Sequence, residues 1–196
     1  MKNPLHAAAA SNDANEIRRL AGEGLPLDSR DGRGRTPLLV ATYLNNIEAA
    51  ETLIALGADI NARDDRRDSP FLYAAAEGRP EILEMTLAAG ADLRSTNRYG
   101  GNALIPACHH EHPDCVRILL RTDIDIDHVN DLGWTALLET VILGDGSEGY
   151  QEIARMLMEA GADASIADPD GVTPLAHAER RGFTEMVAII ARQTDG

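Results

Sequence analysis

A short phrase returns along this chain at a fixed spacing, and this recurrence constrains the fold more than any other feature. Its versions include TPLLVAT, SPFLYAA, NALIPAC and TALLETV. They begin at Asn3, Thr36, Ser69, Asn102, Thr135 and Thr173. Successive starts are 33 residues apart, except the last, which follows after 38. Repeats of this length stack on one another, because none can bury its apolar face alone. The sequence therefore predicts a stack of six repeats.

Within each repeat the residue types predict two helices. A Ser or Thr that begins the phrase is a helix cap, and the Pro that often follows suits the first helical position, where no N–H is needed. The first helix reaches a turn after about seven residues, at Asn12, Asn45, Gly78 and Gly182. A second helix follows, for example EAAETLIAL from Glu48. It ends at a glycine suited to the left-handed conformation, namely Gly24, Gly57, Gly90 or Gly161. The polar link to the next repeat is predicted to be a β-turn finger.

A second phrase, seen as LGADINARD, AGADLRSTN and AGADASIAD, accompanies the first. With the period, the two phrases resemble the ankyrin repeat, which carries T-P-L-H-x-A-A and G-A-D-x-N phrases. The resemblance implies an all-α ankyrin-repeat solenoid of stacked helix-turn-helix units with β-turn fingers along a concave groove. We expect a single domain over 1–196. Its repeats fall at about 1–30 (N-cap), 31–63, 64–96, 97–129, 130–167 (with an insertion at 144–150) and 168–196 (C-cap).

Composition narrows the class of partner. The chain has 196 residues and a formal net charge of −14, which argues against binding nucleic acid or anionic lipid through its overall field. Two cysteines are too few for a secreted disulfide scaffold and favour a reducing compartment. Neither a signal-peptide core nor an apolar run long enough for a membrane span is present. We therefore expect a cytoplasmic protein, and a monomer because both ends of the array look capped.

Mapping by register gives a candidate surface for a protein partner. In proteins that resemble the ankyrin repeat, partners contact the finger tips and the exposed ends of the inner helices. The residues at such positions include the only Trp, and Trp, Tyr and Arg dominate binding hot spots. They are Arg33, Arg35, Tyr43, Leu44, Arg66, Arg98, Tyr99, His109, His110, Leu132, Trp134 and Leu143. A structural alternative stays open: the finger arginines pair with neighbouring aspartates, and Trp134 packs against the adjacent finger.

The charge of the fingers suggests the chemistry of the partner. The first three fingers are neutral or basic and carry Arg33, Arg66 and Arg98, whereas the last two are acidic. A partner segment with acidic groups and aromatic or aliphatic anchors suits such a surface.

The stretch CHHEHPDC, residues 108–115, has the residue types of a metal site or a redox-active cysteine pair. By register Cys108 and Cys115 occupy positions of buried alanines, so we expect two small buried side chains. His112 occupies the place of a turn histidine, and His109 and His110 face the groove. The alternative function is therefore a metal- or small-ligand-responsive adaptor that uses His109 and His110, although the spacing matches no established zinc pattern. We expect no cofactor.

The fourth and fifth repeats depart from the pattern. Pro106 removes a backbone hydrogen bond inside the first helix, and Glu111 and Asp123 replace residues expected in the left-handed conformation. The insertion GDGSEGY predicts a looser turn. It lacks the ending of a phosphate-binding loop, and no nucleophile–base constellation can be assembled from the sequence. We therefore expect no enzymatic activity and no catalytic residue.

Overall fold

The computed structural model describes residues 3–194, and over this range its regular secondary structure is entirely helical. The helices follow one another as six pairs, each a short first helix and then a second one. They are α1 (Pro4–Ala10), α2 (Ala14–Gly22), α3 (Pro37–Tyr43), α4 (Ile47–Ala55), α5 (Pro70–Ala76), α6 (Pro80–Ala88), α7 (Leu104–His109), α8 (Pro113–Leu119), α9 (Ala136–Ile142), α10 (Glu148–Glu159), α11 (Pro174–Arg181) and α12 (Thr184–Thr194). The all-α prediction is confirmed.

The first helix of a pair, called the inner helix below, begins directly after the first residue of the phrase in every pair except α7. The Oγ1 atom of Thr36 accepts a hydrogen bond from the backbone N–H of Leu39 at 3.2 Å and so caps α3. Ser69 accepts the equivalent bond from the N–H of Leu72, Thr135 from that of Leu138, and Thr173 from that of Ala176. Each cap satisfies a backbone donor that the first helical turn leaves unpaired. A cap residue directly ahead of the apolar run therefore sets the start of these helices.

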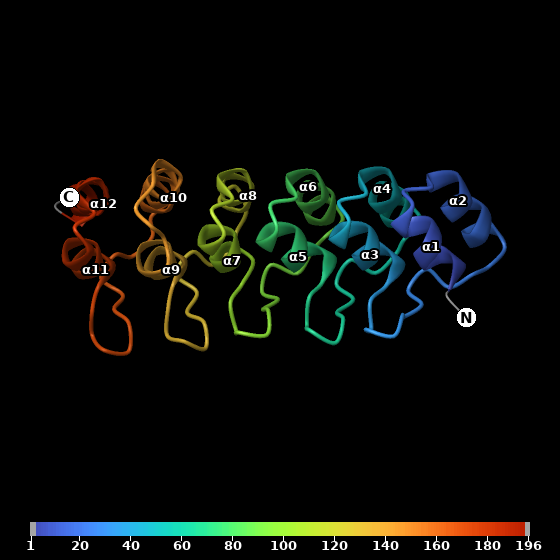
Figure 1. The fold of residues 1–196 in the computed structure, drawn as a ribbon, viewed down its shortest axis with the longest axis horizontal. Helices are drawn as coiled ribbons and strands as arrows, with labels where there is room; N and C mark the ends of the chain where they lie inside the picture. Colours follow the sequence, from blue (N-terminus) through green and yellow to red (C-terminus); the bar gives the residue numbers. More distant parts are fainter. Residues whose placement is uncertain (1–2, 195–196) are drawn as a thin grey trace. The chain divides into compact units, whose positions relative to one another are not determined.

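The helices gather into two compact units, which we call the N-terminal and the C-terminal unit. The N-terminal unit comprises residues up to Ala75 together with Arg79–Asp92. In Figure 1 its inner helices α1, α3 and α5 form one row, and α2, α4 and α6 form a second row. Its core includes the fully buried side chains of Leu38, Leu53 and Phe71. The link after each pair extends as a finger from the inner row, on the side away from the second row (Figure 1).

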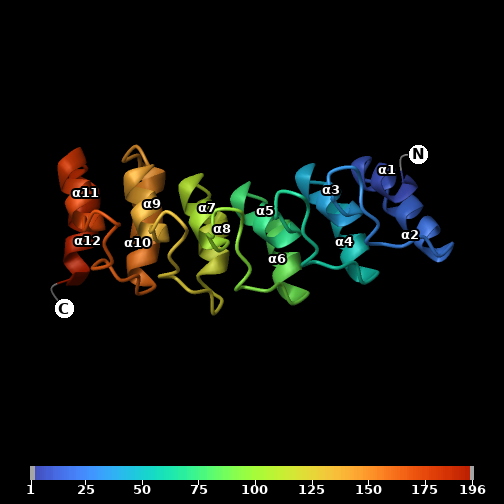
Figure 2. The ribbon, with the colours of Figure 1, turned by 90° about the horizontal axis from the view of Figure 1, so that it is seen from below.

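The C-terminal unit comprises Ala76–Gly78 and the chain from Leu93 onward. Its inner helices are α7, α9 and α11, and each contacts its partner α8, α10 or α12. Figure 2 shows these three pairs one after another along the unit, from α7 with α8 to α11 with α12. The core is built by the same phrase positions as before, for example Leu104, Leu137 and Leu138. The prediction of one domain over 1–196 stays a prediction.

Left-handed turn residues lie where the sequence placed them, with one exception. Asn12, Asn45, Gly78 and Gly182 have φ angles of 56°, 55°, 63° and 70°. Glu111 has a φ of 57°, so a strained residue fills this turn as predicted. The prediction for Asp123 is wrong, because its φ is not positive. The chain leaves α8 differently there. Thr122 donates to the Leu119 carbonyl from its N–H at 3.0 Å and from its hydroxyl at 2.6 Å.

Pro106 has the predicted effect on its helix. In the N-terminal unit the N–H of Val40 donates to the Thr36 carbonyl at 3.0 Å, and this bond closes the first turn of α3. Pro106 occupies the equivalent position, has no N–H, and α7 begins only at Leu104. The Oδ1 atom of Asn102 holds the start of α7 instead, by accepting from Leu104 N at 3.1 Å.

The insertion at 144–150 is held more firmly than a loose turn. The Tyr150 hydroxyl donates to the His109 carbonyl at 2.7 Å, and the Ser147 hydroxyl lies 2.8 Å from Oε1 of Glu111. Gly146, at a φ of 82°, lets the Phe183 ring approach to where a side chain would otherwise stand. The insertion therefore ties the fifth repeat to its two neighbours.

Candidate functional site

Each finger is closed by one Asp or Asn side chain at its base. In the first finger, Oδ1 of Asp31 accepts hydrogen bonds from the N–H groups of Arg33 at 2.8 Å and Arg35 at 3.0 Å. The same pair of bonds is made by Asp64, Asn97, Asn130 and Asp168. Such short-range bonds fix a loop that has no other regular structure. The three residues that follow the base residue, such as Gly32, Arg33 and Gly34 in the first finger, form the finger tip and are presented on a rigid loop.

Sequence reasoning missed these base residues, although a signal was present. An Asp or Asn recurs at 31, 64, 97 and 130, with the same period of 33 as the phrase, and at 168 after 38. The second side-chain atoms of Asp31, Asn130 and Asp168 also find partners. Oδ2 of Asp31 faces Arg35, Nδ2 of Asn130 donates to Glu139, and Oδ2 of Asp168 lies 2.7 Å from Nε2 of His177. The base residue thus joins its finger to neighbouring side chains, including those of inner helices.

Tyr43, a predicted contact residue, is engaged inside the N-terminal unit. Its ring stacks on Tyr73 with a centroid distance of 3.8 Å. Its hydroxyl lies 3.0 Å from Oδ2 of Asp68 and 3.2 Å from Oδ2 of Asp64. Burial, followed by the negative charges of these two carboxylates, raises the pKa of the phenol. Tyr43 therefore positions the second finger against α3.

Arg35 is likewise engaged, as the structural alternative predicted. Its Nε and Nη2 atoms donate to Oδ2 of Asp31 at 2.9 and 2.7 Å, and its guanidinium carbon lies 5.5 Å from the Tyr43 ring centroid. Although burial opposes ionisation, the hydrogen bonds from Arg35 and from the Arg33 and Arg35 backbone lower the pKa of Asp31 to about 2. A weaker pair joins Arg66 to Asp68 at 3.6 Å. The finger arginines are thus partly committed to carboxylates.

Other predicted residues of the N-terminal unit face solvent. Leu44, at the end of α3, is 54% exposed. Arg33, on the first finger tip, is exposed and has no ion-pair partner among the described residues. Arg66 keeps 59% of its side chain exposed despite its contact with Asp68. These three side chains form the accessible part of the predicted surface in this unit.

In the C-terminal unit two large side chains occupy equivalent places on adjacent finger tips. Tyr99 is 53% exposed and Leu132 is 52% exposed. The two tips are joined by a backbone hydrogen bond of 2.9 Å from Asp131 N to the Tyr99 carbonyl. The guanidinium of Arg98 lies over the Tyr99 ring at 4.6 Å and donates to the Tyr99 hydroxyl at 2.8 Å. Rigid, exposed apolar groups of this kind lose little entropy on binding.

The other predicted residues of this unit differ in how far their side chains are exposed to solvent. Leu143 at the end of α9 is 41% exposed, whereas Trp134 is half-buried at the base of its finger. His110 is exposed, and its Nδ1 atom lies 2.6 Å from the Ala76 carbonyl. The half-buried Trp134 therefore suits both roles that the sequence left open, contact with a partner and packing against the finger.

His109 lies over a buried carboxylate that sequence reasoning did not single out. Its Nδ1 atom is 3.5 Å from Oε2 of Glu139, and Oε1 of Glu139 accepts from Asn130 Nδ2 at 2.8 Å. Burial raises the pKa of Glu139 to about 7, against the lowering effects of Asn130 and His110. Burial, followed by the charge of His110, lowers the pKa of His109. The signal in the sequence was a lone acid at the phrase position held elsewhere by Val40 or Tyr73.

The CHHEHPDC stretch is a repeat connector in this structure. Cys108 and Cys115 are both fully buried, as predicted, and burial raises the pKa of the Cys108 thiol. The His112 ring packs against Gly78, whose missing side chain makes room for it. Within residues 3–194, no group of three or more His, Cys, Asp or Glu side chains is arranged to hold a metal ion.

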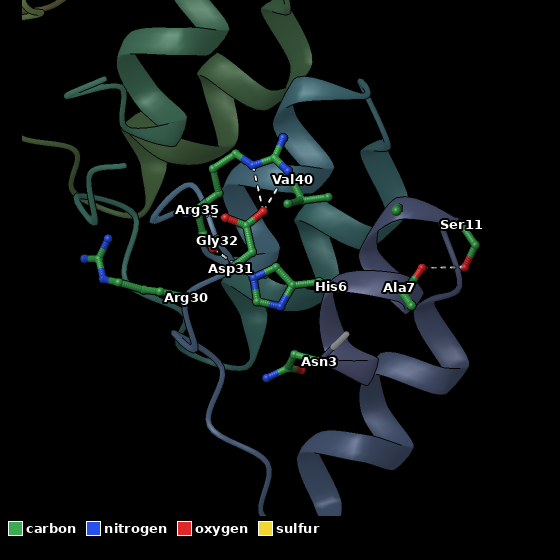
Figure 3. Close-up of a pocket in the computed structure, with 10 residues that line it drawn as sticks. Asn3, His6, Ala7, Ser11, Arg30, Asp31, Gly32, Arg35 and Val40 are labelled. Carbon is green, nitrogen blue, oxygen red and sulfur yellow. Dashed lines mark hydrogen bonds and ion pairs between the residues drawn. The ribbon is translucent and has the colours of Figure 1, made fainter. Parts of the chain in front are cut away.

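A hollow of about 720 Å³ lies in the N-terminal unit beside α1 (Figure 3). Its lining residues come from α1, the start of α3 and the first finger. They are Asn3, His6, Ala7, Ala10, Ser11, Arg30, Asp31, Gly32, Arg35 and Val40. Figure 3 shows the His6 ring between Asn3 and the Asp31–Arg35 pair. The Nε2 atom of His6 lies 2.8 Å from the Arg35 carbonyl, which holds the first finger against α1.

A family model matches the sequence of these repeats. The model for ankyrin repeats (3 copies) matches residues 1–64 and 71–168. The chain belongs to the ankyrin repeat family. Ankyrin repeats are protein–protein interaction modules, and the fold is generally non-catalytic. In the described part of the chain, no helix combines the length and the apolar character that crossing a membrane requires.

Solved ankyrin repeat structures resemble the whole chain. An ankyrin repeat domain from Acinetobacter baumannii AYE is 51% identical with a TM-score of 0.95, covering 97% of each chain. The ankyrin repeat protein EF0377 is 45% identical with a TM-score of 0.93, covering 96% of each chain. The ankyrin repeat domain of Bcl-3, a member of the IkappaB protein family, is 26% identical with a TM-score of 0.89. That match covers 98% of this chain and 86% of the Bcl-3 chain.

A curated relative matches over a shorter stretch. The ankyrin repeat protein YahD of Escherichia coli K12 is 41% identical over 54 residues. The match covers 28% of this chain and 27% of YahD.

Proposed function

We propose that this protein is a non-catalytic interaction module that binds a segment of a partner protein through its finger tips and inner-helix ends. The observation that carries the proposal is the Tyr99–Leu132 pair, two half-exposed apolar side chains on neighbouring tips. Asn97 and Asn130 hold these tips before any partner arrives. An anchor that is already ordered contributes most of its contact free energy to affinity. Family membership supports the same class of function.

The exposure of the predicted residues supports a division of their proposed roles. We assign direct contact to the exposed group, which is Arg33, Leu44, Arg66, Arg98, Tyr99, His110, Leu132 and Leu143. Arg35, Tyr43 and His109 interact with residues of their own unit, so we assign them positioning roles. Trp134 is half-buried, and we assign it to the edge of the contact surface.

We propose a protein as the partner and not nucleic acid, because the net charge of −14 repels a polyanion. We propose a monomer in the cytoplasm and the repeat boundaries given above. No catalytic role is proposed for the cysteines, since neither thiol is exposed. No contact of His109 or His110 favours the ligand-responsive alternative.

The test compares partner capture by the parent chain and by a double variant, Tyr99→Ala with Leu132→Ala. The immobilised proteins are incubated with a lysate of the source cell, and bound proteins are compared by quantitative mass spectrometry. We expect a partner retained by the parent to be lost at least about tenfold in the variant, since a central anchor contributes 2 kcal/mol or more.

Leu56→Ala is the matched control, because Leu56 is 41% exposed but lies at the end of α4, outside the proposed surface. Unchanged circular dichroism of each variant shows that the fold is intact. A partner held equally by the parent and the double variant contradicts the proposal.

A further inference from the structure

The hollow beside α1 exists because small residues occupy positions that are larger in the next repeat. Ala7 and Ala10 stand 33 residues before Val40 and Tyr43, at the same places of the phrase. Tyr43 fills its place by stacking on Tyr73. Both alanines are exposed and, with Val40, give the hollow an apolar floor. A short apolar side chain of a partner fits against such a floor.

The charges that line the hollow sum to one positive charge. Its acidic residue Asp31 is neutralised by the two hydrogen bonds from Arg35. The second arginine, Arg30, donates from Nη1 to the carbonyls of Gly34, at 2.7 Å, and Arg63. These acceptors are neutral, so they orient the guanidinium and leave its charge uncancelled. The hollow is thus locally positive in a chain whose net charge is −14.

Most other polar groups of the hollow are already bonded to the protein. Asn3 Nδ2 donates to the Ser29 hydroxyl at 2.7 Å, and the Ser11 hydroxyl donates to carbonyls of α1. His6 Nε2 donates its proton to the Arg35 carbonyl, since a carbonyl can only accept. The remaining N–H groups of Arg30, at the exposed rim, are donors available to a ligand.

We propose that this hollow binds a segment of the partner that carries an acidic side chain and, further along the segment, a small apolar residue. The carboxylate pairs with Arg30, whose side chain extends from the rim away from His6 and Ala7 (Figure 3), and the apolar residue rests on Ala7, Ala10 and Val40. Arginine suits this role because it offers several donors in one plane to a carboxylate. The inference rests on the proposed function and adds the chemical class of one partner group and its place.

The test is selection of peptides by the full chain from a random library displayed on phage. Enriched peptides are synthesised with a fluorophore, and their dissociation constants are measured by polarisation. We expect enrichment of Asp or Glu together with a small apolar residue in the same peptide. Replacing that acid by its amide, or Arg30→Gln in the protein, weakens binding by about tenfold, and added salt weakens it further.

Two further variants test the hollow: one closes it, and the other is a control for the loss of a positive charge elsewhere. Ala10→Tyr installs the residue that the next repeat carries at this place, so the fold accommodates it while the hollow closes, and we expect binding to be lost. Arg121→Gln removes an exposed positive charge in the C-terminal unit and leaves binding unchanged.

The outcomes also separate this inference from the proposed function. Peptides without an acid, no enriched peptide, or equal affinity for the parent and Arg30→Gln overturn the inference. Binding that is lost in the Tyr99→Ala, Leu132→Ala variant but kept in Arg30→Gln and Ala10→Tyr overturns it too. In that last case the proposed function stands.

Discussion

The imidazole of His109 lies over the carboxylate of Glu139, with 3.5 Å between Nδ1 and Oε2. The carboxylate is buried and also accepts a hydrogen bond from Asn130, the base residue of the fourth finger. The protonation of Glu139 is therefore connected to the finger that carries Leu132 and Trp134.

Glu139→Gln tests this connection through the pH dependence of stability. Burial raises the pKa of Glu139 from 4.5 to about 7, so the folded chain holds a proton that the unfolded chain releases between these values. This contribution to stability is present below pH 4.5 and is lost as the pH rises through 7, with a slope of at most about 1.4 kcal/mol per pH unit. The glutamine keeps the acceptor for Asn130 and removes the titration. Urea unfolding of both proteins across this range measures the difference.

We expect the stability of the glutamine variant, compared with that of the parent at the same pH, to be higher at pH 8 than at pH 4.5. His109→Gln is the companion variant, because the lowered pKa of His109 has the opposite sign, destabilising the fold as the pH falls below the ordinary histidine value. Parallel stability curves for Glu139→Gln and the parent would show that Glu139 titrates alike in both states.

Tyr43→Phe is expected to lower the free energy of unfolding by about 1–2 kcal/mol, because it removes the hydroxyl that donates to the Asp68 and Asp64 pair. The ring keeps its stacking on Tyr73. Tyr99→Phe removes the same atom from an exposed ring, and we expect a loss below about 0.5 kcal/mol. Equal losses in the two variants, measured by urea unfolding, would contradict the positioning role of Tyr43.

Arg67→Gly is expected to stabilise the protein by about 1 kcal/mol. Arg67 has a φ of 68° at the finger position that Gly34, Gly100, Gly133 and Gly171 occupy elsewhere. Glycine adopts this conformation without the steric cost that an L-residue bears. Thermal unfolding measures the gain. Arg66→Gly, one residue earlier and outside the left-handed region, serves as the control and is expected to destabilise. A gain from both changes would point to charge as the cause, not the backbone.

Asn97→Ala is expected to destabilise the protein by about 1–3 kcal/mol, because the N–H groups of Tyr99 and Gly101 lose the acceptor that closes the third finger. Amide hydrogen exchange at these two positions should accelerate while the helices stay protected. Asn15→Ala, which removes an exposed amide on α2, should leave exchange in the finger unchanged. Unaltered exchange at Tyr99 in the Asn97 variant would mean that the tip is held by other contacts.

The repeat pattern predicted the fold because each helix end depends on residues close in sequence. Thr36 caps its helix through a donor three residues away, and Gly57 turns the chain alone, so local chemistry suffices. Asp123 broke this rule because the hydroxyl of Thr122, its neighbour, supplied another way to end α8.

The candidate surface was less predictable, because the exposure of a side chain depends on its contacts within the finger and with the neighbouring repeat. Register placed Tyr43 and Arg35 at contact positions, but their partners Tyr73, Asp68 and Asp31 decide that they pack within the unit. Tyr99 and Leu132 have no such enclosing neighbours and are exposed as predicted. The sequence pattern identifies a position, and the residues that contact it, in its own or the next repeat, decide whether it is exposed.

Four of the five base residues, Asp31, Asp64, Asn130 and Asp168, follow a rule about acid and amide. Where the second side-chain atom meets a donor, as with Arg35, Tyr43 or His177, the base residue is Asp. Where it meets the carboxylate of Glu139, the base residue is Asn, which supplies an N–H. Exchanging one NH₂ for oxygen at position 130 would set two acceptors against each other. Among descendants of this chain, a change at 130 should therefore be inherited together with a change at 139.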